Sequence, residues 1–425
     1  MRSLLKISIL FMISITIACS PNKEGKQVEE IITAEQILGN RYFTAISFGG
    51  FREETRAICP SVEDLREDMK ILGAIDIKII RTYSTQLFPH AERVLKAIHE
   101  LKEQDSTFEM YVMLGAWIEC EGAFTSTRNH AKGNVKGNNA EIKRAIELAK
   151  EYPDIVKIIA VGNESMVHWA ETYSVSAKVV LNYVEQLQEL KKAGKLDSNL
   201  WVTSSDNFAS WGGASTDYHT DDLTKLIQAV DYVSMHTYPF HDTHYTPKFW
   251  QIDSTDLTKG RIQLAEEGML RAKEYAISQY KSTKKHIHSI APNKPIHIGE
   301  TGWATSAYTN YGVEGSRAAD EFKQKLYYDY MRDWSSENEL SCFFFEAFDE
   351  PWKDSFDAKA SENHFGLINI KSEAKYVLWN AVDSGKFKGL LRNGNTITKT
   401  YGGNEEEMLR SILAPSKKPK LKNKP

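Results

Sequence analysis

The chain has 425 residues, of which 41 % are hydrophobic and 26 % charged, a composition typical of a globular protein with a large core. Its net charge of −4 argues against nucleic acid as a partner, because such partners require a basic surface. Its four cysteines match no zinc or redox spacing, which argues against a metal centre or thiol chemistry built on them.

The first residues predict an export signal. Residues 1–6 carry positive charge, and residues 7–18 are almost wholly apolar but too few to cross a membrane as a helix. The run ends in TIACS (residues 16–20), which resembles a bacterial lipobox, although Thr16 stands where that motif usually has Leu. The resemblance implies a lipoprotein signal peptide over residues 1–19 and acyl chains, such as palmitate, on Cys19. Ordinary cleavage without lipid is the alternative.

This segment also predicts where the protein works. A lipid on Cys19 would anchor the protein outside the cytoplasm on a bacterial membrane, and the outer membrane, at the cell surface or the periplasmic face, is the expected one. Residues 20–33 are polar and charged, which predicts a tether between the anchor and the first folded element.

From residue 34 onward, short apolar runs alternate with helical patterns. The runs predict strands at 43–48, 77–83, 110–117, 156–163, 200–205, 230–238, 295–300 and 341–348. Apolar spacing near 3.6 predicts helices at 62–72, 91–101, 140–151, 177–192, 222–229, 264–280 and 319–334, with an eighth at 374–383. Eight strand–helix repeats predict an α/β fold, a single (β/α)8 TIM barrel domain over residues 34–413. Residues 414–425 are rich in Lys and Pro, which predicts a disordered tail.

Two glutamates stand at the ends of predicted strands. Glu164 ends VGNE (161–164) after the fourth strand, and Glu300 ends the seventh strand within GETGW (299–303). An unpaired carboxylate at the tip of a buried strand is costly, so these residues require a chemical reason. Catalytic groups of such barrels lie at the carboxyl ends of the strands, so both side chains are expected to face one cleft. Two facing carboxylates are the groups that glycoside hydrolysis requires.

These two segments resemble the signature motifs of glycoside hydrolase family 17, which contains β-1,3-glucanases and related β-glucan transferases. Three more segments resemble that family at matching strands: IRTY (80–83), LGAW (114–117) and FEAFDEPWK (345–353), the last in its microbial and fungal branch. The likeness covers about residues 40–375. It implies a retaining mechanism in which Glu164 is the general acid/base and Glu300 the nucleophile.

The matching motifs also suggest how the site is furnished. Glu300 must be ionised while Glu164 holds a proton, so hydrogen-bond donors are expected around Glu300, with Arg81 and Tyr238 as the candidates. Asn163 would bind the sugar 2-hydroxyl. No metal and no cofactor are expected. The tryptophans and Tyr83 are expected either to stack on sugar rings or to pack in the wall of the cleft. Glu346 and Lys353 are expected either to bind sugar hydroxyls or to form an ion pair with each other. The full set of expected substrate-binding residues is Asn163, Arg81, Tyr83, Trp117, Tyr238, Trp303, Glu346, Trp352 and Lys353.

We therefore expect a retaining hydrolase that cleaves laminarin-type β-1,3-glucan within the chain, with β-glucan and a membrane as its partners. Three alternatives stay open. The enzyme could be a β-1,3-glucan transglycosylase, in which a sugar replaces water. It could be a non-catalytic glucan-binding lipoprotein, although both glutamates are intact. It could also act on β-1,4 or β-1,6 linkages, since a fold does not fix a function.

Overall fold

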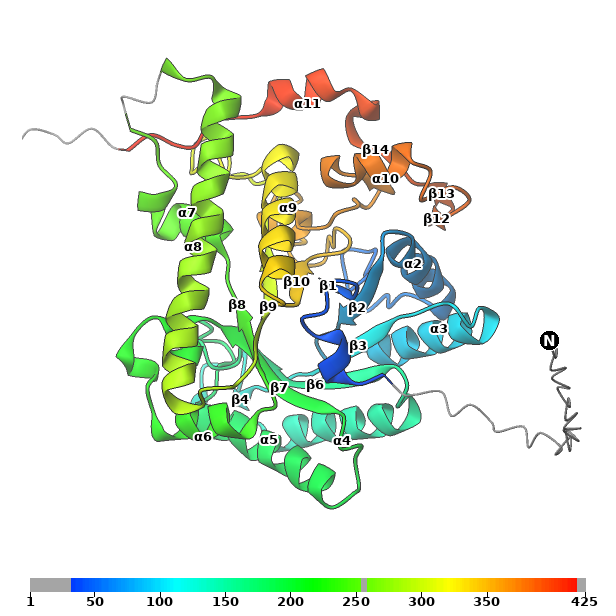
Figure 1. Ribbon diagram of the computed structural model, residues 1–425, viewed down its shortest axis with the longest axis vertical. Coiled ribbons are helices and arrows are strands. Elements are labelled where there is room, and N and C mark those ends of the chain that lie inside the picture. Colours follow the sequence, from blue (N-terminus) through cyan, green and yellow to red (C-terminus); the bar gives the residue numbers. More distant parts are fainter. Residues whose placement is uncertain (1–31, 254–257, 419–425) are drawn as a thin grey trace, which may run out of the picture. The chain divides into compact units, whose positions relative to one another are not determined.

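Eight parallel strands close into a barrel, as the strand–helix alternation predicts (Figure 1). The computed structural model describes residues 32–253 and 258–418, so the predicted signal peptide, Cys19 and residues 20–31 of the predicted tether lie outside the described residues. The strand order around the barrel is β1-β10-β9-β8-β7-β6-β3-β2. The barrel strands are β1 (Thr44–Ser47), β2 (Ile77–Arg81), β3 (Tyr111–Ala116), β6 (Val156–Asn163), β7 (Trp201–Asn207), β8 (Val233–His236), β9 (Ile296–Gly302) and β10 (Cys342–Phe345).

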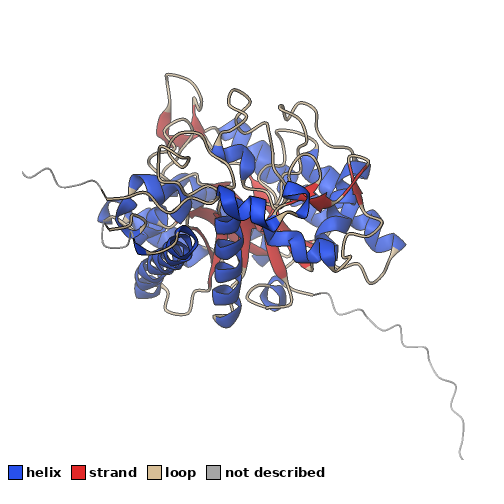
Figure 2. Cartoon of the chain, turned by 90° about the horizontal axis from the view of Figure 1, so that it is seen from above, coloured by secondary structure: helices blue, strands red, loops and turns tan. Residues whose placement is uncertain are grey.

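Helices lie outside the strands (Figure 2). All seven helices predicted between the strands are present, and the last before β9 continues to Ile290 rather than residue 280. The eighth prediction, 374–383, is confirmed as an α-helix only for its second half, Trp379–Asp383. Ala374 instead belongs to strand β11 (Glu373–Ala374), which pairs with β14 (Thr398–Lys399), and Tyr376–Leu378 forms a 3-10 turn. The α-helices are α1 (Ala34–Ile37), α2 (Val62–Ala74), α3 (His90–Gln104), α4 (Val135–Glu151), α5 (Ala177–Lys192), α6 (Asp221–Ala229), α7 (Pro239–Tyr245), α8 (Arg261–Ile290), α9 (Glu321–Glu337), α10 (Trp379–Asp383) and α11 (Glu405–Ser411).

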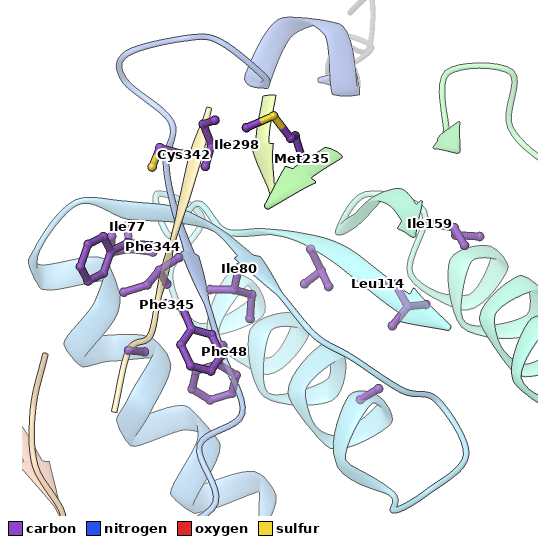
Figure 3. Packing of buried hydrophobic residues seen from close by; sticks show 14 of the residues in the cluster. Phe48, Ile77, Ile80, Leu114, Ile159, Met235, Ile298, Cys342, Phe344 and Phe345 are labelled. Atoms are coloured by element: carbon purple, nitrogen blue, oxygen red, sulfur yellow. The ribbon is translucent and has the colours of Figure 1, made fainter. Parts of the chain in front are cut away.

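In strands such as β2 and β6, successive residues enter two different hydrophobic clusters. Ile79 of β2 and Ile158 of β6 belong to a small cluster that fills the barrel. Their neighbours Ile80 and Ile159 belong to a large cluster shared with the surrounding helices, part of which is shown in Figure 3. Side chains of a strand alternate between its faces, and both faces are covered here. Strands such as β2 and β6 therefore read as largely apolar runs, which is why the sequence reveals them.

The short helix α1 closes the amino-terminal end of the barrel. Thr33 caps it, with its hydroxyl accepting a hydrogen bond from the Gln36 N–H while the Gln36 side chain accepts one from the Thr33 N–H. Its buried residues Ala34 and Ile37 join the cluster inside the barrel, next to strand residues such as Ile79. The chain thus enters the domain from the end of the barrel where the strands begin.

The last part of the chain, from β11 onward, packs over the outside of the barrel. The hairpin of β12 (Leu391–Arg392) and β13 (Asn395–Thr396) is fixed to α2, because the buried Arg392 Nε donates to Asp68 Oδ1 at 2.9 Å. The predicted tail boundary at residue 413 is too early. Pro415 is buried, and the Ile252 N–H donates to the Ser416 carbonyl at 3.0 Å, so the ordered domain includes residues 414–418.

No helix within the described ranges is both long and apolar enough to pass through a bilayer. The remaining short elements stand in loops. They are the hairpin strands β4 (Cys120–Glu121) and β5 (Asn129–Gly133), a π turn at Ala209–Gly213, and 3-10 turns at Thr216–Tyr218, Pro247–Phe249, Ser361–His364, Tyr376–Leu378 and Thr400–Gly403.

Candidate active site

The carboxyl ends of four barrel strands bring Glu164 and Glu300, the predicted catalytic pair, together with Arg81, Asn163 and His236. Arg81 is the last residue of β2, Asn163 the last of β6, and His236 the last of β8. Glu164 directly follows β6, and Glu300 lies within the second half of β9. Because parallel strands of one barrel end on the same side, these five side chains share that side.

Glu300 lies buried among hydrogen-bond donors. Only 6 % of its surface is exposed. Oε2 accepts from Arg81 Nη1 at 2.5 Å and from the Tyr83 hydroxyl at 3.2 Å, and Oε1 accepts from the Tyr238 hydroxyl at 2.5 Å. The donors expected from the sequence, Arg81 and Tyr238, therefore both contact this carboxylate.

These neighbours decide the protonation state of Glu300. Burial alone would raise the pKa of Glu300, but the charges of His236 and Arg81, together with the hydrogen bond from Tyr238, outweigh burial and lower the pKa below its usual value. Glu300 is thus held as a carboxylate at neutral pH, which is the form that can act as a nucleophile.

Glu164 has different surroundings. Its side chain is 24 % exposed, and Oε1 lies 3.1 Å from Nδ1 of the fully buried His236. The His236 Nε2 in turn lies 2.7 Å from the Ser205 hydroxyl. A carboxyl group that is open to the cleft and faces one imidazole contrasts with a carboxylate enclosed by donors. Such a contrast is what one acid and one nucleophile in the same site require.

The backbone at Glu164 is strained in a way that fits a functional residue. Its φ of 45° lies in the left-handed region, which costs a non-glycine residue about 1–2 kcal/mol. The turn is held in place because the Glu164 N–H donates to the Ser205 carbonyl on β7 at 2.9 Å. The strain is therefore balanced by a bond to the neighbouring strand.

Asn163 faces Arg81. Its Oδ1 accepts a hydrogen bond from Arg81 Nη2, which fixes the orientation of the amide. Among the described residues, no hydrogen bond uses the Asn163 Nδ2 group, so its two protons are available to a ligand.

Two lobes of one cleft meet at Glu300, which lines both of them together with Phe345 and Glu362. The lobe that includes Glu164, here called the Glu164 lobe, has a volume of about 830 Å³. The other includes Asn163, is called the Asn163 lobe, and has a volume of about 670 Å³. The Glu164 lobe is also lined by Trp169, Asn207, Phe208, Tyr238, His241, Asp242, Tyr245, Tyr311 and Phe365. The Asn163 lobe is also lined by Phe48, Gly49, Phe51, Arg56, Tyr83, Ser84, Leu87, Phe88, His90, Trp117, Glu119, Phe124, Tyr173, Glu350, Trp352 and Lys353.

Of the predicted sugar contacts, Tyr83, Trp117, Trp352 and Lys353 line the Asn163 lobe, and Tyr238 lines the Glu164 lobe. The prediction for Trp303 is wrong. Its side chain is fully buried, and its indole Nε1 donates to the Ala318 carbonyl at 2.8 Å, so no sugar can stack on it.

Glu346 also lies below the cleft surface, at 1 % exposure. Its Oε1 accepts from Lys353 Nζ at 2.5 Å, which is the ion pair that the sequence left as the alternative to direct sugar binding. Burial, only partly offset by Lys353, raises the pKa of Glu346 well above its usual value. Lys353 reaches the cleft and Glu346 positions it from beneath.

Two buried carboxylates that the sequence analysis missed hold the loops of the site. Asp206, at the end of β7, accepts from the Met166 N–H at 2.8 Å and from the Ser210 hydroxyl at 2.6 Å, and burial raises the pKa of Asp206 to about 6. Glu141 of α4 accepts from the Thr85 N–H at 2.7 Å and the Trp117 N–H at 3.2 Å. Asp206 stands one strand after Glu164 at the same kind of position, a signal that could have identified it.

The arrangement predicts a pH effect for His236→Asn. The positive charge of His236 lowers the pKa of Glu300, so its removal is expected to raise that pKa. Activity that needs an ionised Glu300 then disappears at a higher pH, and the acid limb of the kcat/KM profile moves upward. Ser205→Ala removes the hydrogen bond to His236 but no charge, so its acid limb is expected to stay in place. If His236→Asn lowers kcat/KM equally at every pH without moving the acid limb, the effect of His236 on the pKa of Glu300 is contradicted.

Comparison with known proteins identifies the family. The family model described as "BtgE/BtgC glycoside hydrolase domain" matches residues 45–366. A probable glucan endo-1,3-beta-glucosidase btgC of Aspergillus flavus is 25 % identical over 339 residues, covering 74 % of this chain and 40 % of that protein. The glucan endo-1,3-beta-glucosidase btgC of Emericella nidulans is 24 % identical over 329 residues, covering 73 % and 41 %. The chain thus spans about 40 % of the length of these curated relatives.

Solved structures agree with the fold. An endo-laminarinase from Formosa Hel1_33_131 is 53 % identical, with a TM-score of 0.89, and the match covers 92 % of this chain and 100 % of that one. A glycoside hydrolase family 17 beta-1,3-glucanosyltransferase from Rhizomucor miehei, at 16 % identity and a TM-score of 0.54, covers 80 % and 97 % and shares the fold. Because the family match extends over most of the barrel and both glutamates, the chain belongs to the BtgE/BtgC glycoside hydrolase domain family.

Proposed function

We propose that this protein is a retaining, endo-acting β-1,3-glucanase that acts on laminarin-type polysaccharide. The observation that carries the proposal is the pair of unlike carboxyl groups in one cleft, Glu300 among donors and Glu164 open beside His236. The 53 % identity to an endo-laminarinase and the names of the curated relatives support β-1,3-glucan as the substrate. We also propose that VGNE and GETGW, which contain the two glutamates, are the signature segments of glycoside hydrolase family 17.

The first step breaks the glycosidic bond. A carboxylate oxygen of Glu300 attacks the anomeric carbon, and the bridging oxygen departs with the electron pair of the broken bond. An alkoxide is a poor leaving group, so Glu164 gives its proton to the bridging oxygen as that oxygen leaves. The sugar is then bound to Glu300 with inverted configuration, and Glu164 is a carboxylate.

The second step releases the product. Water enters where the leaving sugar was, and Glu164 removes one of its protons as the oxygen attacks the anomeric carbon. Glu300 departs with the electrons of the glycosyl–enzyme bond, and the donors Arg81, Tyr83 and Tyr238 stabilise its returning charge. Two inversions give net retention, and both carboxyl groups return to their starting states.

The positions of Glu164 and Asn163 in the two lobes support a direction for the bound polysaccharide. The bridging oxygen leaves with the sugars on the Glu164 side, since Glu164 protonates it, so the Glu164 lobe holds the leaving part of the chain. Asn163 lines only the other lobe and offers its free amide protons to the 2-hydroxyl of the glycosyl unit. The Asn163 lobe therefore holds the part that becomes attached to Glu300.

Product analysis on laminarin and on linear β-1,3-oligosaccharides tests this function. We expect a ladder of internal cleavage products early in the reaction, and newly formed reducing ends that are first detected as the β-anomer by NMR. Products longer than the starting oligosaccharide would favour transglycosylation. Binding of laminarin without any new reducing ends would favour a glucan-binding protein instead.

We also propose that the protein is extracytoplasmic and anchored to a bacterial membrane by lipid on Cys19. The lipobox-like TIACS sequence and the polar segment that follows it support this location. A polymer that cannot enter a cell also has to be cut outside it. Mass spectrometry of the amino-terminal peptide of the mature protein would detect the acyl chains, and an unmodified mature terminus would contradict the proposal.

A further inference from the structure

Two aromatic rings in the Glu164 lobe are exposed to an unusual degree. Trp169 is 59 % exposed and Tyr245 is 70 % exposed, and both line this lobe. By contrast, Trp211, Trp250 and Trp303, which come from neighbouring loops, are fully buried. A tryptophan left open beside a catalytic acid has apolar surface that its own fold does not use.

The loop that carries Trp169 is held firmly. It begins directly after Glu164, and the Met166 N–H donates to the buried Asp206 at 2.8 Å. The His168 N–H donates to the Tyr218 hydroxyl at 3.0 Å, and the His168 ring stacks on Tyr218 with centroids 4.1 Å apart. The exposed indole is therefore presented by a fixed loop, which lowers the entropy cost of binding a ligand to it.

We propose that Trp169 is the stacking platform for a glucosyl unit on the leaving side of the scissile bond. The inference rests on the proposed glucanase function and deepens it. The faces of a β-glucopyranose ring carry C–H groups while its hydroxyls point outward, so such a face packs well on a flat, apolar indole. Trp169 lines the lobe that contains Glu164 and not the lobe that contains Asn163, which places this contact beyond the bond that Glu164 protonates.

The placement has a kinetic consequence. A substrate with several sugars on the leaving side gains binding energy from Trp169. This gain favours cleavage within the polysaccharide over release of the single sugar at its reducing end. A substrate whose leaving group is a single aromatic alcohol has no sugar for the platform. The contribution of Trp169 should therefore depend on the substrate, whereas a purely structural contribution would not.

The test compares kcat/KM for laminarihexaose and for 4-nitrophenyl β-laminaribioside. Trp169→Ala is expected to lower kcat/KM about tenfold on the hexasaccharide and to leave the aryl substrate within about twofold of wild type. Trp169→Phe keeps a smaller aromatic face and should recover most of the loss. Tyr42→Ala is the matched control, because Tyr42 is 70 % exposed and lines neither lobe, and it should change neither value.

If Trp169→Ala lowers kcat/KM equally on both substrates, the stacking role is contradicted and a structural role for Trp169 is indicated. No loss on the hexasaccharide would overturn it as well. The proposed function is measured separately, by whether the wild-type protein cleaves the hexasaccharide at all, while the platform is measured directly by binding. In the Glu164→Gln background, Trp169→Ala should weaken laminarihexaose affinity in calorimetry, and unchanged affinity would contradict the proposal.

Discussion

Replacing Glu300 by alanine is expected to abolish laminarin hydrolysis, with kcat lowered by about 10⁴-fold or more, because no group remains to form the covalent intermediate. The substitution leaves space next to Arg81, Tyr83 and Tyr238, whose donors all point at the lost carboxylate. Azide can occupy that space and attack the anomeric carbon from the side that Glu300 used. We therefore expect partial rescue by azide, with an α-glycosyl azide as the product identified by NMR.

The same variant should lose stability. Arg81 is only 1 % exposed and forms its ion pair with Glu300, so the variant leaves an unpaired buried guanidinium, which typically costs about 3–5 kcal/mol. Azide should raise the Tm of this variant more than that of the wild type, because an anion then faces Arg81 again. Glu300→Gln preserves the shape of the side chain and serves as the control for folding. A β-glycosyl azide from Glu300→Ala would show that the two roles have been exchanged.

Replacing Glu164 by alanine is expected to depend strongly on the leaving group. Hydrolysis of laminarin should fall by about 10²–10⁴-fold, since a sugar alkoxide cannot depart without a proton. A 2,4-dinitrophenyl β-glycoside of laminaribiose needs no proton, so its first step should survive and the glycosyl–enzyme should accumulate. A burst of dinitrophenol in rapid-mixing experiments would measure this.

Azide again identifies the role of the missing group. In Glu164→Ala the intermediate still forms on Glu300, and azide attacks it from the opposite face, in the space that Glu164 and the water normally occupy. The expected product is the β-glycosyl azide, with turnover of the activated substrate increased. His236 is expected to remain beside the vacated position, because it also binds Ser205 at 2.7 Å. Equal losses on activated and natural substrates would contradict the role of Glu164 as acid.

The barrel could be predicted from the sequence because several of its strands, such as β3, β6 and β10, are buried on both faces and stand out as apolar runs. The Trp303 error shows what that reading omits. Side chains alternate along a strand, so Trp303, three residues after Glu300, points to the opposite face. Thr301 lies on the same face as Trp303, and its hydroxyl Oγ1 is 2.8 Å from the hydroxyl of Tyr327 on α9, so this face contacts the helices. Applying the period of two beyond the end of the strand would have placed Trp303 in the core.

Other features depend on contacts between distant segments, which no local pattern contains. Ala374, the first residue of the predicted eighth helix, pairs with β14 instead, some 25 residues later, and the predicted tail docks on Ile252. Trp169 stands in a loop with no periodicity, and only the closed barrel shows that it lines the cleft. The proposed catalytic pair stands within motifs because the chemistry restricts their residues, whereas the walls of the cleft arise from the fold as a whole.

The helix α1 gives the molecule a polarity. It closes the barrel at the end where the strands begin, whereas the cleft opens at the end where the strands finish. The described chain therefore enters the barrel at one end, and the candidate active site lies at the other. An extended polysaccharide can therefore reach the cleft without passing the point where the chain enters the barrel.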